Sequence, residues 1–234
     1  MPQQFYVAER LFDKNNPYFS SFFLKFDCQE LRLFFESHDK ERRYLTHFFF
    51  YVESLVCVKN TSDTTIADFN TAGFLSHLHA EKLWYALLLT ILIGIIDKTI
   101  SNSMNSVVCE CCGKVKNKAK ESFKTIMLQM EEDEQKYLVN YYKGGRFRHE
   151  DFIKIIEDIY SDRTFFAHDI ANLETPQKDG LIFDKRDEGV FIGFNIKPEA
   201  ILLYIVKQLL KNWGYGKELL VSTEKEFKNI SDFI

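Results

Sequence analysis

The chain has 234 residues, of which 46% are hydrophobic, 15% are aromatic and 27% are charged, with only 10 Gly and 4 Pro. This composition excludes disordered, collagen-like and simple-repeat proteins, and a chain of this length buries enough surface to fold without a disulfide or metal staple. The 30 Lys and Arg residues against 34 Asp and Glu residues give a net charge of −4, which argues against a protein that binds nucleic acid through bulk charge alone.

Targeting signals and cysteine usage indicate the compartment. The first ten residues lack a basic start followed by an apolar run, so we expect no secretory signal. The five cysteines are an odd number without the regular spacing of a disulfide framework. A reducing, cytoplasmic environment is therefore predicted.

The first predicted element is a long amphipathic helix. Apolar residues from Leu31 to Val56 recur at steps of three, four and seven, the spacing that places side chains on one helical face. The polar segment 60–65, Asn-Thr-Ser-Asp-Thr-Thr, is typical of turns and is expected to end this helix. We assign residues 1–75 to an N-terminal helical extension, which can also pack as part of one domain.

A second helix is predicted to begin near Ser76 and to run to about Ile100. It contains the longest apolar stretch of the chain, residues 83–96. This stretch is shorter than the roughly 18–20 residues that cross a bilayer. We therefore expect a helix that is buried on all sides, and no membrane partner.

Three further helices and a hairpin are predicted after the cysteine cluster 109–112. The first helix covers 123–141 and ends at Gly144-Gly145, the second covers 152–160, and the last follows Pro198 and ends near Trp213. Apolar clusters flank a polar turn between Leu181 and Asn195, the pattern of a β-hairpin. The predicted fold class is therefore all-α, a bundle of about five to six helices with one small β-hairpin, in which residues 76–234 form the second domain.

One motif follows the predicted helix 152–160. Arg163-Thr-Phe-Phe-Ala-His168 has an Asp before the Arg, and two apolar residues and an Ala before the His. It resembles the motif of the HEPN superfamily, an Arg and a His with four to six residues between them in a helical chain. Two other pairs with this spacing lie inside the predicted first helix. The resemblance covers about residues 76–213 and implies a metal-independent endoribonuclease with Arg163 and His168 as catalytic residues.

The two residue types suit RNA cleavage. RNA carries its own nucleophile, the 2′-hydroxyl, so an enzyme must move protons and stabilise negative charge on the phosphate. An imidazole, with an ordinary pKa of about 6.5, can act as base or acid near neutrality, and a guanidinium holds phosphate oxygens with two parallel hydrogen bonds. The products are expected to be a 2′,3′-cyclic phosphate and a 5′-hydroxyl. Supporting polar neighbours are predicted at Asp162, Thr164 and Asp169.

The spacing has a geometric consequence. Five residues of a regular helix rotate by about 500°, which leaves Arg163 and His168 about 140° apart. Either the helix is irregular at Arg163, or a second protomer completes the site, and the resemblance implies the second arrangement, a homodimer. The structural alternative is a solvated, salt-bridged helix start with Asp162 at its amino end.

Two other clusters were considered as sites. The densest basic region is predicted to contact RNA phosphates, although it can also be a solvated helix face balanced by the acidic residues 131–134. It consists of Lys114, Lys116, Lys118, Lys120, Arg146 and Arg148. Cys109 and Cys112 are a weaker zinc alternative, but tetrahedral zinc takes four ligands and no second cysteine pair follows. We therefore expect no metal and no cofactor.

The resemblance thus implies a ribonuclease with a toxin, abortive-infection or antiviral role, with RNA as substrate and an antitoxin or regulatory protein as a further partner. The alternative, from another class, is a catalytically silent helical dimer of the same type that binds a nucleotide, RNA or a partner protein. Two features distinguish these alternatives. One is Thr164, because active members of the superfamily often carry Asn, His or another strongly polar residue at this position. The other is His168, whose burial away from any groove would exclude catalysis.

Overall fold

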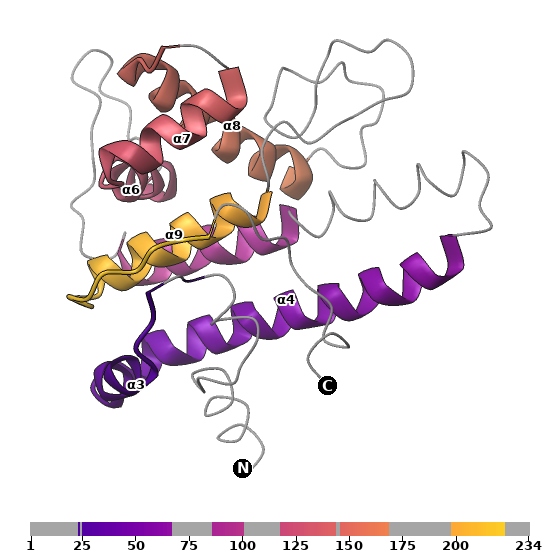
Figure 1. Ribbon diagram of the computed structural model, residues 1–234, viewed down its shortest axis with the longest axis vertical. Helices are drawn as coiled ribbons and strands as arrows, with labels where there is room; N and C mark the ends of the chain where they lie inside the picture. Colours follow the sequence, from indigo (N-terminus) through magenta and orange to yellow (C-terminus); the bar gives the residue numbers. More distant parts are fainter. Residues whose placement is uncertain are drawn as a thin grey trace. The chain divides into compact units, whose positions relative to one another are not determined.

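The computed structural model describes residues 23, 25–66, 86–100, 118–143, 146–168 and 198–222, and all statements below concern these ranges. The labelled helices are α3 (Cys28–Glu36), α4 (Asp39–Ile66), α6 (Lys118–Met127), α7 (Glu132–Lys143), α8 (His149–His168) and α9 (Pro198–Asn212). An unlabelled helix covers residues 86–99. The described part of the chain is helical, as predicted (Figure 1). Within it, one isolated antiparallel bridge joins Phe23 and Val221. The predicted hairpin lies outside the described residues.

The chain divides into two compact units. The first unit comprises Met1–Leu88 and Leu210–Ile234, and the second comprises Leu89–Leu209. The boundary predicted between residues 75 and 76 lies outside the described residues. The second unit is therefore one continuous stretch of chain, whereas the first unit is made from both ends of it.

The predicted long first helix is two helices, α3 and α4. At the break, the Phe34 carbonyl accepts hydrogen bonds from Ser37 Oγ at 3.0 Å and lies 2.8 Å from His38 Nδ1, while the His38 amide donates to the Phe35 carbonyl. Side chains here take the place of the backbone bond that would continue α3. Asp27 begins α3 by accepting hydrogen bonds from the amides of residues 29 and 30.

The predicted end of the first helix at residues 60–65 is wrong, because α4 continues to Ile66. Asn, Thr, Ser and Asp lower helix propensity by only a few tenths of a kcal/mol each. Extending an existing helix also avoids the cost of nucleating a new one, so a short polar run does not by itself end it.

The core of the first unit is formed by one face of each helix and by the chain after α9. Leu31 and Phe35 of α3, and Leu45 and Phe48 of α4, are almost fully buried. Lys25 and Glu218 form an exposed ion pair beside the Phe23–Val221 bridge. The start and the end of the described chain are thus joined.

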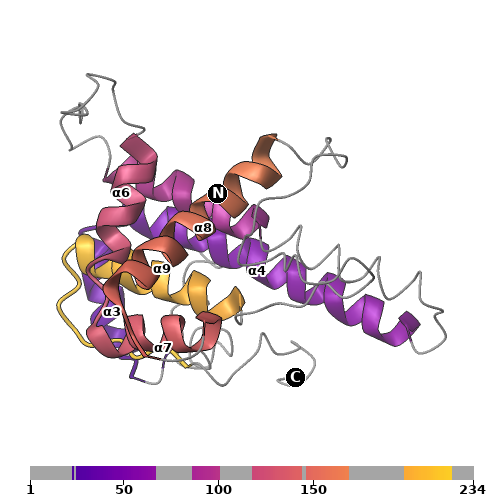
Figure 2. The same ribbon diagram turned by 90° about the horizontal axis from the view of Figure 1, so that it is seen from above.

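The second unit is built around α8, which contacts α6 and α7 (Figures 1 and 2). The predicted apolar stripe of α8 is confirmed, since it is buried along its whole length. Its members are Phe152, Ile155, Ile156, Ile159 and Tyr160. Full burial of each large apolar side chain contributes about 1.5–3 kcal/mol to stability.

The helix predicted over 123–141 is interrupted between α6 and α7. The Glu131 amide donates to the Glu134 side chain at 3.2 Å, and the Gln135 side chain donates to the Met130 carbonyl at 2.8 Å. The acidic run 131–134 is favourable at the amino end of a helix and begins α7. As predicted, α7 ends directly before Gly144.

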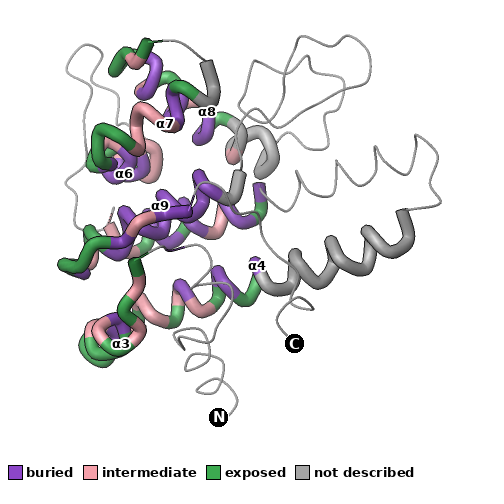
Figure 3. Tube along the Cα trace, viewed as in Figure 1, coloured by how far each residue is buried: buried purple, intermediate pink, exposed green. Residues whose placement is uncertain are grey.

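Two apolar helices differ in their exposure. Residues 200–210 of α9 are buried on every side (Figure 3). The helix 86–99 was expected to be buried all round, but Leu87 is 40% exposed and Gly94 and Lys98 are also exposed. These three positions recur at intervals of seven and four residues, so they form one solvent-facing stripe.

The end of α9 was predicted correctly at Trp213-Gly214. The Tyr215 amide donates to the Leu210 carbonyl, and the Gly214 amide donates to the Lys211 carbonyl. This is the Schellman arrangement, in which the residue at Gly214 takes a positive φ, here 100°. The same turn places the Tyr215 ring in a buried position, edge-on to Phe34 at 5.5 Å.

Candidate active site on α8

The Arg–His motif lies within α8, in its last two turns. The backbone of α8 is α-helical up to His168, so Asp162 does not begin a helix. The proposed helix-start alternative, and with it the favourable dipole position of Asp162, is therefore wrong. The backbone also lacks the irregular turn at Arg163 that could have brought both residues together.

Arg163 continues the buried stripe of α8. It follows Ile159 and Tyr160 by four and three residues, the spacing of side chains on one helix face. Its guanidinium carbon lies 5.9 Å from the centroid of the Tyr160 ring. Tyr160 is itself buried and lies 6.1 Å from the Phe123 ring of α6. The packing of α6 against α8 thus supports the ring beneath Arg163.

The Arg163 side chain is half-buried, and its Nε atom is buried without a hydrogen-bond partner among the described residues. Burial of an unsatisfied donor is unfavourable, whereas a phosphate oxygen would satisfy it. The contact with the Tyr160 ring leaves the positive charge of the guanidinium in place. These features suit a group that binds an anion.

His168 occupies a different side of α8. Seven residues correspond to nearly two helical turns, so the His168 position follows that of Ser161, which is exposed. The side chains of Asp162, Thr164 and His168 lie outside the described residues, and so does all of Asp169. On the backbone of α8, Arg163 and His168 stand about 140° apart, too far around the helix to meet at one phosphate.

The densest basic region of the sequence is described in part, and its two lysines on α6 do not lie on one face of that helix. Lys118 and Lys120 lie on α6 two residues apart, about 200° around the helix. Arg146 is exposed before α8. Arg148 donates two hydrogen bonds to Asp151, at 2.6 and 3.0 Å, and hydrogen bonding to this carboxylate raises the pKa of the guanidinium above its ordinary value.

Further observations bear on the other predicted ligands. Lys114, Lys116, Cys109 and Cys112 lie outside the described residues. Within the described ranges, no group of three or more His, Cys, Asp or Glu side chains is arranged to hold a metal ion. No described helix combines the length and the apolar character needed to cross a membrane.

One contact at the site was not predicted from the sequence. The aromatic support of Arg163 by Tyr160 follows from an i, i+3 spacing, which the sequence displays, but Tyr160 was assigned only to the core.

Comparisons with protein-family models, with curated proteins and with solved structures found no match to this chain.

Proposed function

We propose that the protein is a metal-independent endoribonuclease of the HEPN type, with Arg163 and His168 as its catalytic residues. The observation that carries this proposal is the state of Arg163. Its guanidinium is half-buried on the Tyr160 ring, and its buried Nε has no acceptor among the described residues. A charged donor held in this way is prepared to bind a phosphate oxygen.

The proposed reaction needs no group beyond the protein and the RNA. His168 removes the proton of the 2′-hydroxyl, whose oxygen attacks the neighbouring phosphorus. The bond from phosphorus to the 5′-oxygen breaks, and the departing oxygen takes a proton from the imidazolium. Arg163 binds the non-bridging phosphate oxygens, on which negative charge accumulates. The products are a 2′,3′-cyclic phosphate and a 5′-hydroxyl.

The proposed site is shared between two protomers. Because α8 is regular through His168, one copy presents the two groups in directions about 140° apart. A second copy related by a two-fold axis can supply His168 to the Arg163 of the first copy, and the reverse. We therefore propose a homodimer.

The test is cleavage of a labelled single-stranded RNA in the presence of EDTA. Arg163→Ala and His168→Ala are each expected to lower the rate by about 100-fold or more. Arg32→Ala and His149→Ala are matched controls, because each removes an exposed residue of the same type outside the motif. Their rates should equal that of the unmodified chain.

The substrate provides a second, chemical test. A strand with a 2′-deoxy nucleotide at the cleaved position should remain intact, and mass spectrometry should find a cyclic phosphate on the cut all-RNA strand. Cleavage that survives both alanine substitutions, or that requires Mg²⁺, would overturn the mechanism. Binding of RNA without any cleavage would instead favour the silent binding dimer.

A further inference from the structure

Outside the candidate site, α4 presents cationic and aromatic side chains on one face. At about 100° per residue, Arg43, His47 and Phe50 lie within about 60° of one another around this helix. Its buried residues, among them Leu45 and Phe48, lie on the opposite side. We call this face the α4 stripe. It consists of Lys40, Arg43, His47, Phe50 and Tyr51.

The aromatic part of the α4 stripe is unusually open. Phe50 is 52% exposed and Tyr51 is 41% exposed, and their ring centroids lie 6.2 Å apart in an edge-on arrangement. Among the described residues only Leu33 and Leu87 are other large apolar side chains with comparable exposure. Single exposed apolar residues are ordinary, but two adjacent aromatic rings beside cations indicate a binding surface.

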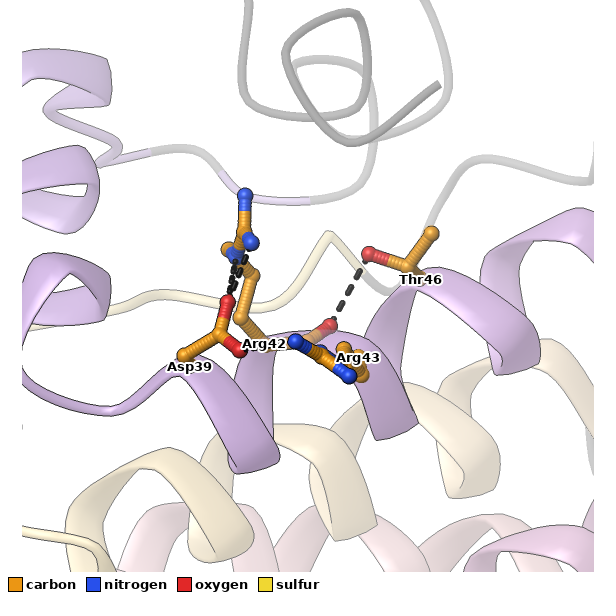
Figure 4. A network of polar contacts seen from close by, with 4 residues as sticks. All are labelled: Asp39, Arg42, Arg43 and Thr46. Carbon is orange, nitrogen blue, oxygen red and sulfur yellow. Dashed lines mark hydrogen bonds and ion pairs between the residues drawn. The ribbon is translucent and has the colours of Figure 1, made fainter. Parts of the chain in front are cut away.

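The charged part of the α4 stripe carries excess positive charge. Asp39 accepts hydrogen bonds from Arg42 and also forms an ion pair with Arg43 at 2.7 Å (Figure 4). The Asp39 carboxylate is therefore shared between two guanidinium groups. The Arg43 side chain remains 73% exposed, and Lys40 is also exposed.

We propose that the α4 stripe binds an unpaired RNA strand, with Lys40 and Arg43 on its phosphates and the rings of Phe50 and Tyr51 on its bases. Positive charge selects a polyanion, and base faces are open to an aromatic ring only where they are unpaired. A second copy of the same face would bring cation against cation. The choice of RNA rests on the proposed function, but binding here does not involve Arg163 or His168.

The test measures binding of a fluorescent single-stranded RNA of about 12 nucleotides to the Arg163→Ala/His168→Ala chain, which leaves the strand uncut. Phe50→Leu and Tyr51→Leu keep apolar bulk but remove the aromatic face, and each should raise the Kd by about fivefold or more. Lys40→Ala and Arg43→Ala should each reduce the slope of log K against log salt by about 0.7.

Matched controls lie elsewhere in the same unit. Leu33→Ala removes an exposed apolar side chain of α3, and Lys25→Ala removes an exposed positive charge before α3. Both should bind RNA as the parent chain does. Because Phe50 and Tyr51 are exposed, their variants should also keep the parent's helical circular dichroism, which separates loss of binding from loss of folding.

Several results would overturn this inference. The first is that both leucine variants bind RNA as tightly as the parent chain. The second is that the chain binds a duplex of the same sequence as tightly as the single strand, or more tightly. The third is that it binds anionic lipid vesicles or polyglutamate more tightly than RNA. The outcome is separable from that of the proposed function. If Arg163→Ala still cleaves RNA, the proposed catalytic site fails, while binding through the α4 stripe is judged by Phe50 and Tyr51 alone.

Discussion

Arg163 differs from Arg42, Arg43 and Arg148 in the partner of its guanidinium. Arg148 and Arg42 donate to neighbouring carboxylates, and Arg43 pairs with Asp39, whereas Arg163 lies on the ring of Tyr160. A carboxylate partner would compete with a phosphate for the guanidinium, but a ring does not. The sequence motif drew attention to Arg163, whereas the support from Tyr160 depends on the packing of α6, which no local sequence pattern indicates.

Tyr215 offers a test at the residue scale. Its hydroxyl is buried and has no hydrogen-bond partner among the described residues. Tyr215→Phe should therefore raise the free energy of unfolding at pH 7 by about 1 kcal/mol, as measured by urea denaturation. Tyr51→Phe, at an exposed position, should leave it unchanged. A lower stability of Tyr215→Phe would show that the hydroxyl has a partner after all.

The same variant has a pH signature. Burial, followed by the nearby charges of Glu30 and Asp27, raises the pKa of Tyr215 to about 12. Because the folded state holds the phenol proton more tightly than the unfolded state, Tyr215 adds no pH dependence to stability below about pH 10, and its ionisation lowers stability as the pH rises toward 12. The decrease in stability over that range should be smaller in Tyr215→Phe than in the parent chain.

At the scale of elements, the sequence predicted where apolar faces lie better than where helices are interrupted. The stripe of α8 and the end of α9 at Gly214 follow from periodicity and from a glycine with a positive φ. The breaks at Ser37 and Glu131 depend on side chains that bond to backbone groups, and the apolar spacing continues across both of them. Periodicity therefore could not locate these breaks.

A buried ion pair connects α7 and α9. The side chains of Lys207 and Glu134 are only 9% and 13% exposed and lie 2.5 Å apart. Lys207→Met should lower the free energy of unfolding by about 3–5 kcal/mol, because Glu134 is left as an uncompensated buried charge. Lys207→Met/Glu134→Gln should recover most of this loss, since neither charge remains.

The control for this pair is an exposed one. Lys124 and Glu157 lie 3.8 Å apart, with side chains 30% and 46% exposed. Lys124→Met should change the free energy of unfolding by less than about 1 kcal/mol in the same chemical denaturation experiment. Equal effects of Lys207→Met and Lys124→Met would contradict the role given to burial.

At the scale of the whole molecule, the proposed shared site predicts complementation. Arg163→Ala and His168→Ala chains, each inactive alone, are mixed, unfolded and refolded together. Random pairing makes half of the dimers mixed, and each mixed dimer holds one intact site of two, so about a quarter of the parent activity should return. If both residues act within one protomer, mixing restores nothing. Light scattering should find the dimer in every sample.

The sequence suggested this proposed arrangement through the spacing of two residues and through the family resemblance of the motif. Five positions on a regular helix separate Arg163 from His168 by about 140°, and the α8 backbone is regular there. The sequence analysis predicted a division of the chain but not that residues 210–222 belong with its first part, because this depends on long-range contacts such as that of Val221 with Phe23. Such long-range pairs leave no periodic pattern.

The bridge between Phe23 and Val221 also has a consequence for synthesis of the chain on the ribosome. The second unit, Leu89–Leu209, is continuous and can form its contacts as soon as it has emerged. The first unit contains residues from two distant parts of the chain. The core around α3 and α4 is therefore complete only after residues 210–222 have been synthesised. Closure of so long a loop is slow, and the order of folding is expected to run from the middle of the chain outward.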